Sequence, residues 1–383
     1  MMHELSIEGL AAGGDGVGHT ADGRVVFVPF SAPGDRLSVR LVEERKRYAR
    51  GVIERILEPS PFRVQPVCGV YGTCGGCTWQ HLDYETQLRA KAEILGDALE
   101  RVGGLRVPDD LRVVPSPAPY GWRSRTRVLA KGGVVGYRKR RSHAVCATSR
   151  CPVLVPELDE ALAQLARRRP QAAEEWELVA GADGATRTTP LRSPLPEEPR
   201  LTVSVCGQRM SFSPGVFVQG NALLLDALAR AVHEAAGSGH LAVELFCGAG
   251  FFTLGLARGF ERVVAVESEG RAVADLHANV LNAGLRNVEI RGGRAERLLA
   301  VLGGADAMVV DPPRTGLPPE CIQGVAEARP RRLVYVSCDP ATLARDLARL
   351  AEGGLALESV TGFDLFPQTP HVEAVASLVS DPA

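Results

Sequence analysis

The 383-residue sequence contains no run of eighteen apolar residues, so we expect no membrane-spanning helix. Its first residues lack a basic stretch followed by an apolar one, which argues against a secretory leader. It also lacks internal repeats and low-complexity tracts, and its formal net charge is only -1. The length favours two or three domains. We expect a cytoplasmic protein that is monomeric and has no membrane association.

The nine cysteines form no recognisable disulfide framework, because their number is odd and no leader precedes them. Three of them form a tight cluster with the spacing Cys68-x5-Cys74-x2-Cys77. Buried thiols or a zinc site are the simple alternatives, and ligation by thiolates alone suits zinc and iron–sulfur clusters equally. We therefore expect a metal site here. Three further cysteines have no other cysteine at a metal-binding spacing, and we interpret them as core residues: Cys206, Cys247 and Cys321.

Acidic residues are absent from positions 121–150, although the chain as a whole is nearly neutral. The basic residues of this segment are Arg123, Arg125, Arg127, Lys131, Arg138, Lys139, Arg140, Arg141 and Arg150. Three aromatic residues lie among or beside them, namely Tyr120, Trp122 and Tyr137. A solvated basic face is the simpler interpretation. The one-sided charge and the aromatic rings favour a nucleic-acid groove that binds phosphates and stacks bases.

The chain divides into three regions by pattern. Residues 1–60 contain short strand-like runs separated by glycine turns, which predicts a small OB-like β-barrel. Residues 61–202 read as a central α+β region, with helical spacing over 84–102 and proline-rich or charged loops near 168–171 and 191–199. Residues 203–383 alternate strands and helices, which predicts an α/β domain with a doubly wound, Rossmann-like parallel sheet. Its expected strands are 241–246, 263–266, 288–290, 308–310, 333–336 and 372–379.

A glycine turn, Glu244–Gly250, follows the first of these strands and precedes a helix. Glycines there let the backbone approach a ligand closely, and Glu267 ends the next strand, where a carboxylate can hold ribose hydroxyls. The turn lacks the third glycine of a dinucleotide fingerprint. We therefore expect an adenosine-type cofactor without a pyrophosphate, such as S-adenosylmethionine.

The sequence Asp311-Pro312-Pro313-Arg314 ends another strand. Asp followed by Pro is a good helix N-cap, and that is the structural alternative to a binding role. Amino-methylating enzymes of this fold carry an aromatic residue after the prolines to stack a base. Arg314 stands there instead, so methylation of an amino group is disfavoured.

Cys338 lies between a strand-like and a helix-like run. A single cysteine is more often a buried structural residue than a reactive one. A helix N-terminus beside it would stabilise the thiolate, which makes Cys338 a candidate nucleophile. Glu373 stands in an apolar run; if it faces inward, burial would raise its pKa and suit it to proton transfer. His371 is read equally well as a loop residue or as a group that orients the catalytic residues.

The segments Ser337–Asp346, Asp311–Arg314 and Phe366–Glu373 resemble the RNA uracil-5-methyltransferase family. The resemblance covers essentially the whole chain and implies an N-terminal TRAM domain and a C-terminal class I methyltransferase domain. It implies Cys338 as nucleophile and Glu373 as general base. The cofactor positions it implies are Gln219, Phe246, Glu267 and Asp311.

The resemblance further implies a 4Fe-4S cluster in preference to zinc, with Cys151 as fourth ligand and Cys146 as its competitor. We expect this cluster to order the central region for RNA. A TRAM-like domain with a cysteine cluster resembles the family members that act on ribosomal RNA, so 23S rRNA is the expected partner. Two departures stand out, because many relatives have Asn where this chain has Phe251 and Asp339.

Three alternatives remain. The first is that the enzyme acts on tRNA instead of rRNA. The second is that it methylates cytosine, although cytosine-5 enzymes place a second cysteine where Pro313-Arg314 stands in this chain. The third alternative is an inactive RNA-binding protein stapled by a metal. The leading expectation is methylation of uracil carbon 5, in which Cys338 adds to carbon 6 of a flipped base.

Overall fold

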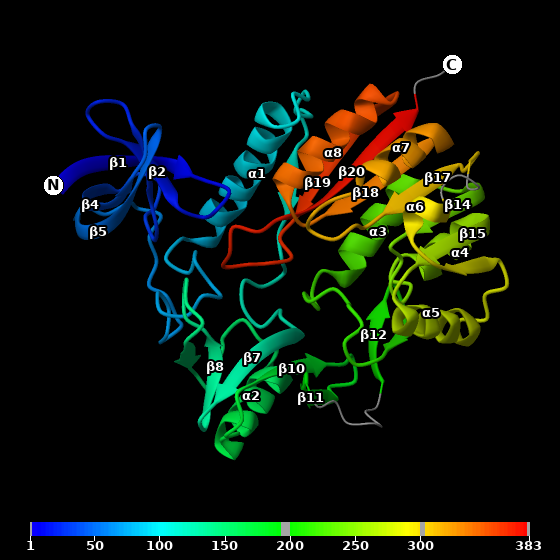
Figure 1. Ribbon diagram of the computed structural model, residues 1–383, viewed down its shortest axis with the longest axis horizontal. Coiled ribbons are helices and arrows are strands. Elements are labelled where there is room, and N and C mark those ends of the chain that lie inside the picture. The colour runs from blue at the N-terminus through cyan, green and yellow to red at the C-terminus, as the bar shows by residue number, and fades with distance from the viewer. Residues whose placement is uncertain (1, 193–199, 299–302, 381–383) are drawn as a thin grey trace.

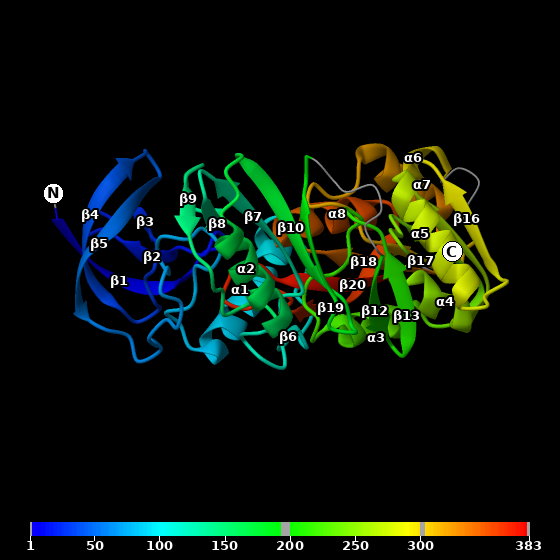
Figure 2. The same cartoon turned by 90° about the horizontal axis from the view of Figure 1, so that it is seen from below.

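A computed structural model describes residues 2–192, 200–298 and 303–380 (Figure 1). A small barrel lies at one end, a large sheet flanked by helices lies at the other, and a third sheet lies between them (Figure 2). Within these residues, no helix combines the length and apolarity needed to cross a membrane. Most of the loop expected at 191–199 falls outside the described residues.

The N-terminal barrel is closed, with the strand order β1-β2-β3-β5-β4. Its strands are β1 (Met2–Leu10), β2 (Gly16–His19), β3 (Val25–Val28), β4 (Arg36–Glu44) and β5 (Tyr48–Glu58). Alternate residues fill the interior, as the two-residue period of a strand requires, among them Leu5, Ile7, Leu37 and Val39. The predicted N-terminal barrel is confirmed.

The central sheet has the order β11-β10-β7-β8-β9. Its strands are β7 (Arg125–Lys131), β8 (Val134–Arg138), β9 (Val145–Ala147), β10 (Glu174–Ala180) and β11 (Thr186–Pro190). Helix α2 (Pro156–Arg168) packs against it, and Leu158 and Leu162 share a core with Val128 and Leu178. A hairpin of β12 (Leu201–Val205) and β13 (Gln208–Phe212) leads into the last region.

The C-terminal sheet has eight strands in the order β16-β15-β14-β17-β18-β20-β19-β6. Its strands are β6 (Arg112–Val114), β14 (Gly239–Leu245), β15 (Phe260–Glu267), β16 (Val288–Gly292), β17 (Ala307–Val310), β18 (Arg332–Ser337), β19 (Leu355–Phe363) and β20 (Glu373–Ser380). Its helices are α3 (Leu225–Ala236), α4 (Thr253–Gly259), α5 (Gly270–Asn282), α6 (Ala295–Leu298), α7 (Pro319–Ala328) and α8 (Pro340–Glu352).

Helices cover both faces of this sheet, so the predicted α/β class is confirmed. Buried residues of α7 and α8 share one core with the sheet, and those of α3 and α4 share another. The expectation of a wholly parallel sheet is wrong, because β20 runs antiparallel to both β18 and β19. Neither β19 nor β6 is among the strands expected from sequence. The reversal of β20 places its first residue at the edge where β17 and β18 end.

Two elements that precede residue 202 complete this C-terminal core. Strand β6 pairs in parallel with β19, and helix α1 (Tyr84–Arg101) packs beside α8. Leu95 and Leu99 of α1 belong to the same buried cluster as Leu343 and Leu347 of α8. The loop between β19 and β20 passes alongside the segment that leads into α1 (Figure 1).

Candidate active site

The ends of β18 and β20 bring the predicted nucleophile and base together. Ser337 pairs with Ala374 at the end of the β18–β20 ladder, and Cys338 and Glu373 are their immediate neighbours in sequence, both on the side where the ladder ends. Glu373 is only 3% exposed, which confirms that it faces inward. Burial raises its pKa well above the ordinary value; Asp311 adds to the rise and Arg314 opposes it.

The environment of Cys338 differs from the expectation. Burial and the neighbouring Glu373 raise the pKa of its thiol to about 11, while Arg314 lowers it. Asp339 does cap helix α8, since its carboxylate accepts a hydrogen bond from the Thr342 amide at 2.9 Å. Burial thus opposes the acidifying effect expected of the helix N-terminus. Arg314 is the cation that favours the thiolate, and sequence reasoning had used it only to exclude amino methylation.

Two more carboxyl groups influence this site, the partly buried Asp311 and the buried Glu244. Asp311 follows β17, and burial raises its pKa to about 7. Burial likewise raises the pKa of Glu244 to about 8, and its carboxylate accepts a hydrogen bond from Thr253 Oγ1 at 2.5 Å. Each group penalises the ionisation of its neighbours. A positively charged ligand would stabilise their ionised forms, so the site suits a cation.

The glycine turn after β14 is tightly built. Phe246, Gly248 and Gly250 all have positive φ, and a Cβ on Gly250 would lie 2.7 Å from a methyl carbon of Leu276. The carboxylate of Glu267 accepts hydrogen bonds from the amides of Gly248 at 3.0 Å and Ser268 at 2.6 Å. The structure thus brings Phe246 and Glu267 to one edge of the sheet, as the pattern predicts.

Gln219 lies on a segment between β13 and α3 and is 7% exposed. Its neighbour Gly220 accepts a hydrogen bond from the Ser124 amide at 2.9 Å. Asn221 Nδ2 lies 3.4 Å and 3.3 Å from the carbonyl oxygens of Asp364 and Leu365, to which it donates. Sequence reasoning missed this contribution of Asn221, although the residue stands two positions after Gln219.

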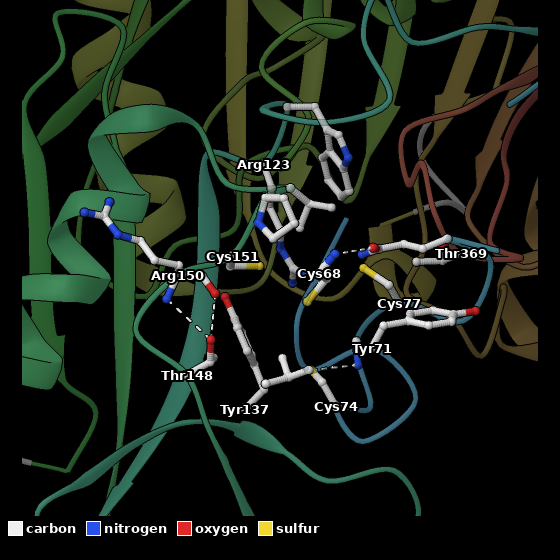
Figure 3. Close-up of a pocket in the computed structure, with 16 residues that line it drawn as sticks. Cys68, Tyr71, Cys74, Cys77, Arg123, Tyr137, Thr148, Arg150, Cys151 and Thr369 are labelled. Carbon is white, nitrogen blue, oxygen red and sulfur yellow. Dashed lines mark hydrogen bonds between the residues drawn. The ribbon is translucent and has the colours of Figure 1, made fainter. Parts of the chain in front are cut away.

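Four cysteines line one pocket between the segment before α1 and the central sheet (Figure 3). They are Cys68, Cys74, Cys77 and Cys151. Burial and the neighbouring thiols raise the pKa of Cys77 to about 12 and that of Cys74 to about 11. Within the described ranges, no group of three or more His, Cys, Asp or Glu side chains is arranged to hold a metal ion. The observation that links the four thiols is therefore the pocket that they line together.

The other cysteines follow the expectation in part. Cys247 and Cys321 are buried, as predicted, whereas Cys206 is only partly buried at a turn, where it packs against the edge of a core cluster. Cys146 is buried on β9 and is not among the residues that line the pocket. His371 is exposed, with its ring centre 6.0 Å from that of Phe366.

Six of the nine basic residues of this segment form ion pairs with acids from other parts of the chain. Arg125 pairs with Glu177 at 2.7 Å. Further pairs are Arg127–Glu177, Arg138–Glu175, Arg140–Asp15, Arg141–Asp15 and Arg150–Asp159. Trp122 is 3% exposed, so the expectation that its ring stacks on a base is wrong. Six of the nine basic residues nevertheless remain exposed, namely Arg127, Lys131, Arg138, Lys139, Arg141 and Arg150.

A mixed sheet of this order, with a glycine turn after its first strand and an acid after its second, defines a class I methyltransferase fold. Residues 198–305 and 304–380 match the family described as tRNA (Uracil-5-)-methyltransferase, and residues 3–53 match the TRAM domain. The 23S rRNA (uracil(1939)-C(5))-methyltransferase RlmD of Alkalilimnicola ehrlichii is 33% identical, covering 97% of this chain and 95% of its own. The chain belongs to the RNA uracil-5-methyltransferase family.

Two further relatives agree with this assignment. A protein of Gloeobacter violaceus described as an uncharacterized RNA methyltransferase is 34% identical over 98% of this chain and 95% of its own. The tRNA (uracil-54, C5)-methyltransferase of Pyrococcus abyssi, solved in complex with S-adenosyl-L-homocysteine, superposes with a TM-score of 0.78. It is 27% identical, and the match covers 98% of this chain and 100% of that one.

Proposed function

We propose that the protein methylates carbon 5 of a uridine in RNA, with 23S rRNA as the substrate. The placement of Cys338 beside Glu373 supports the chemistry, because the reaction needs a thiolate and a base on the same uracil. The names and full-length coverage of the ribosomal relatives support the choice of RNA.

The two residues act in sequence on the base. The Cys338 thiolate adds to carbon 6, and the electron pair released to carbon 5 makes that carbon nucleophilic. S-adenosylmethionine supplies the methyl group that carbon 5 takes up. Glu373 then removes the proton from carbon 5, and the carbon–sulfur bond to Cys338 breaks to restore the thiolate. The raised pKa of Glu373 suits it to hold that proton.

We assign Gln219, Phe246, Glu267 and Asp311 to the methyl donor. Phe246 and Glu267 lie at the glycine turn, and Asp311 ends the neighbouring strand β17. The donor carries a sulfonium and an ammonium group, so it matches the buried acids near Glu244.

We assign a 4Fe-4S cluster to Cys68, Cys74, Cys77 and Cys151, which line one pocket. A single tetrahedral zinc would draw its thiolates to within about 3.8 Å of one another, given Zn–S bonds of about 2.3 Å. A four-iron cluster binds each thiolate through a different iron, so its four thiolates stand farther apart around a larger group. Cys151 is favoured over Cys146 because it lines that pocket. The cluster would fix the segment before α1 against the central sheet.

The test offers purified protein and S-adenosylmethionine to 23S rRNA and tRNA transcripts, followed by nucleoside analysis. We expect 5-methyluridine in 23S rRNA. Methylation confined to tRNA would favour the second candidate, which the Pyrococcus abyssi structure supports, and 5-methylcytidine would contradict the choice of base. RNA containing 5-fluorouridine, whose carbon 5 has no proton to lose, should trap a covalent complex that requires Cys338. Binding of RNA without either product would support the inactive RNA-binding protein.

A further inference from the structure

The loop that leads from β19 into Glu373 is hydrogen-bonded to the cysteine segment. The carbonyl oxygen of Gln368 accepts hydrogen bonds from the amides of Thr78 at 3.1 Å and Trp79 at 3.0 Å. Thr78 directly follows Cys77, and Thr369 lines the cysteine pocket (Figure 3). Two segments almost 300 residues apart in sequence therefore form one unit.

Gln87 of α1 stands at the centre of this unit and is completely buried. Its Oε1 accepts a hydrogen bond from the Gln368 amide at 2.9 Å. Its Nε2 lies within hydrogen-bond distance of three oxygens, namely Gln368 Oε1 at 3.2 Å, the Trp79 carbonyl at 3.2 Å and the Leu82 carbonyl at 3.0 Å. One side-chain amide thus joins helix α1, the cysteine segment and the loop before Glu373.

The backbone of Gln368 needs such support. Its φ is 71°, in the left-handed region that costs a residue with a side chain free energy. Such conformations persist only where the surrounding contacts hold them. Lys91 and Asn221 hold the start of the loop, through Phe366 and Leu365 respectively. Gln87 holds residue 368, which is closer in sequence to Glu373 than Leu365 and Phe366 are.

We propose that Gln87 is a positioning residue that holds Glu373 opposite Cys338 by fixing Gln368. The inference rests on the proposed function, because it assumes that Glu373 removes the proton from carbon 5. Loosening this contact misplaces the base but leaves the glycine turn and Cys338 in place. The covalent intermediate should therefore form, and its breakdown should become slow.

The experiment uses the full chain with Gln87→Met, which keeps the length of the buried side chain and removes the amide. With 23S rRNA and S-adenosylmethionine, we expect turnover to fall roughly ten- to hundredfold, the scale set by small misplacements of catalytic groups. We also expect a denaturation-resistant RNA–protein adduct to accumulate, and the donor Kd to stay within about twofold of the wild-type value. Gln323→Met is the matched control, since Gln323 is exposed on α7 and should leave every measurement unchanged.

Gln368→Gly provides a second variant if Gln87→Met fails to fold. It removes the side-chain partner of Gln87 Nε2, and the conformational freedom of glycine lets residue 368 leave the conformation that Gln87 holds. The adduct should accumulate in this variant as well. If folded variants turn over at the wild-type rate, or lose turnover without accumulating adduct, the inference is overturned. Wild-type protein that makes no 5-methyluridine would instead contradict the proposed function.

Discussion

Ser337 lies opposite Ala374 across β18 and β20, and this one pairing decides where the reactive groups meet. Cys338 directly follows the last residue of β18, and Glu373 is the first residue of β20, so nucleophile and base lie at the same edge of the sheet. A parallel β20 would carry Glu373 to the opposite edge. The reversal of this strand is therefore a requirement of the proposed chemistry.

Replacing Cys338 by Ala should abolish both methylation and the covalent complex with 5-fluorouridine RNA, because no thiolate remains to attack carbon 6. Calorimetric binding of S-adenosylmethionine should be unchanged. Cys206→Ala is the control, since Cys206 lies at a turn beside α3 and should retain full activity. Retained turnover in Cys338→Ala would refute the nucleophile assignment.

Glu373→Gln keeps the shape of the side chain but removes its ability to accept a proton. The covalent intermediate with unmodified uridine should accumulate and decay slowly on a denaturing gel. Glu358→Gln is a suitable control, because Glu358 lies on β19 and pairs with Arg332 away from Cys338. Normal turnover in Glu373→Gln would assign the base to another group.

The reactivity of Cys338 toward iodoacetamide should rise with pH in the free protein, because the thiolate reacts and the thiol pKa is about 11. The rate should climb about tenfold per pH unit well below that value. At pH 9, Glu373→Gln should react faster, since it removes an acid that raises the thiol pKa, and Arg314→Ala should react slower. Equal rates in all three proteins would contradict this electrostatic arrangement.

Anaerobically purified protein should contain about four irons and four acid-labile sulfides per chain if the 4Fe-4S assignment holds. Cys151→Ser should lose most of that iron, and Cys146→Ser should retain it, because Cys151 lines the pocket and Cys146 does not. Stoichiometric zinc would overturn the assignment. If Cys146→Ser lost its iron and Cys151→Ser did not, Cys146 would replace Cys151 as the assigned fourth ligand.

Lys91 and Asp364 form an ion pair in which both side chains are completely buried. Lys91→Met should lower the free energy of unfolding by about 3–5 kcal/mol, because it leaves a buried carboxylate without its cation. Adding Asp364→Leu should recover much of the loss, as measured by urea unfolding. A double variant as unstable as the single one would show that packing, not charge, dominates at this position.

The sequence predicts most of the reactive edge, because parallel strands end together and strand ends can be read from apolar runs. The glycine turn, Glu267, Asp311 and Cys338 all come from such ends. Strand β6 is only three residues long, which is too short for a pattern. Strand β19 alternates exposed and buried positions unevenly around a bulge near Ser359.

Charge proved harder to predict than fold. Several arginines of the basic segment form ion pairs with Asp15, Glu175 and Glu177, none of which lies within it. The pKa of Cys338 follows from burial and from Glu373, which is 35 positions away in sequence. Both effects depend on which distant segments pack together, and local patterns carry little information about that packing.

The pairing of β6 with β19 has a practical consequence for anyone who divides this chain. A fragment that begins at residue 203 would leave β19 as an open edge and strip α1 from α8. Open strand edges and exposed apolar helix faces promote aggregation. The catalytic half should therefore express as insoluble material on its own, and it should become soluble when residues 84–114 are supplied with it.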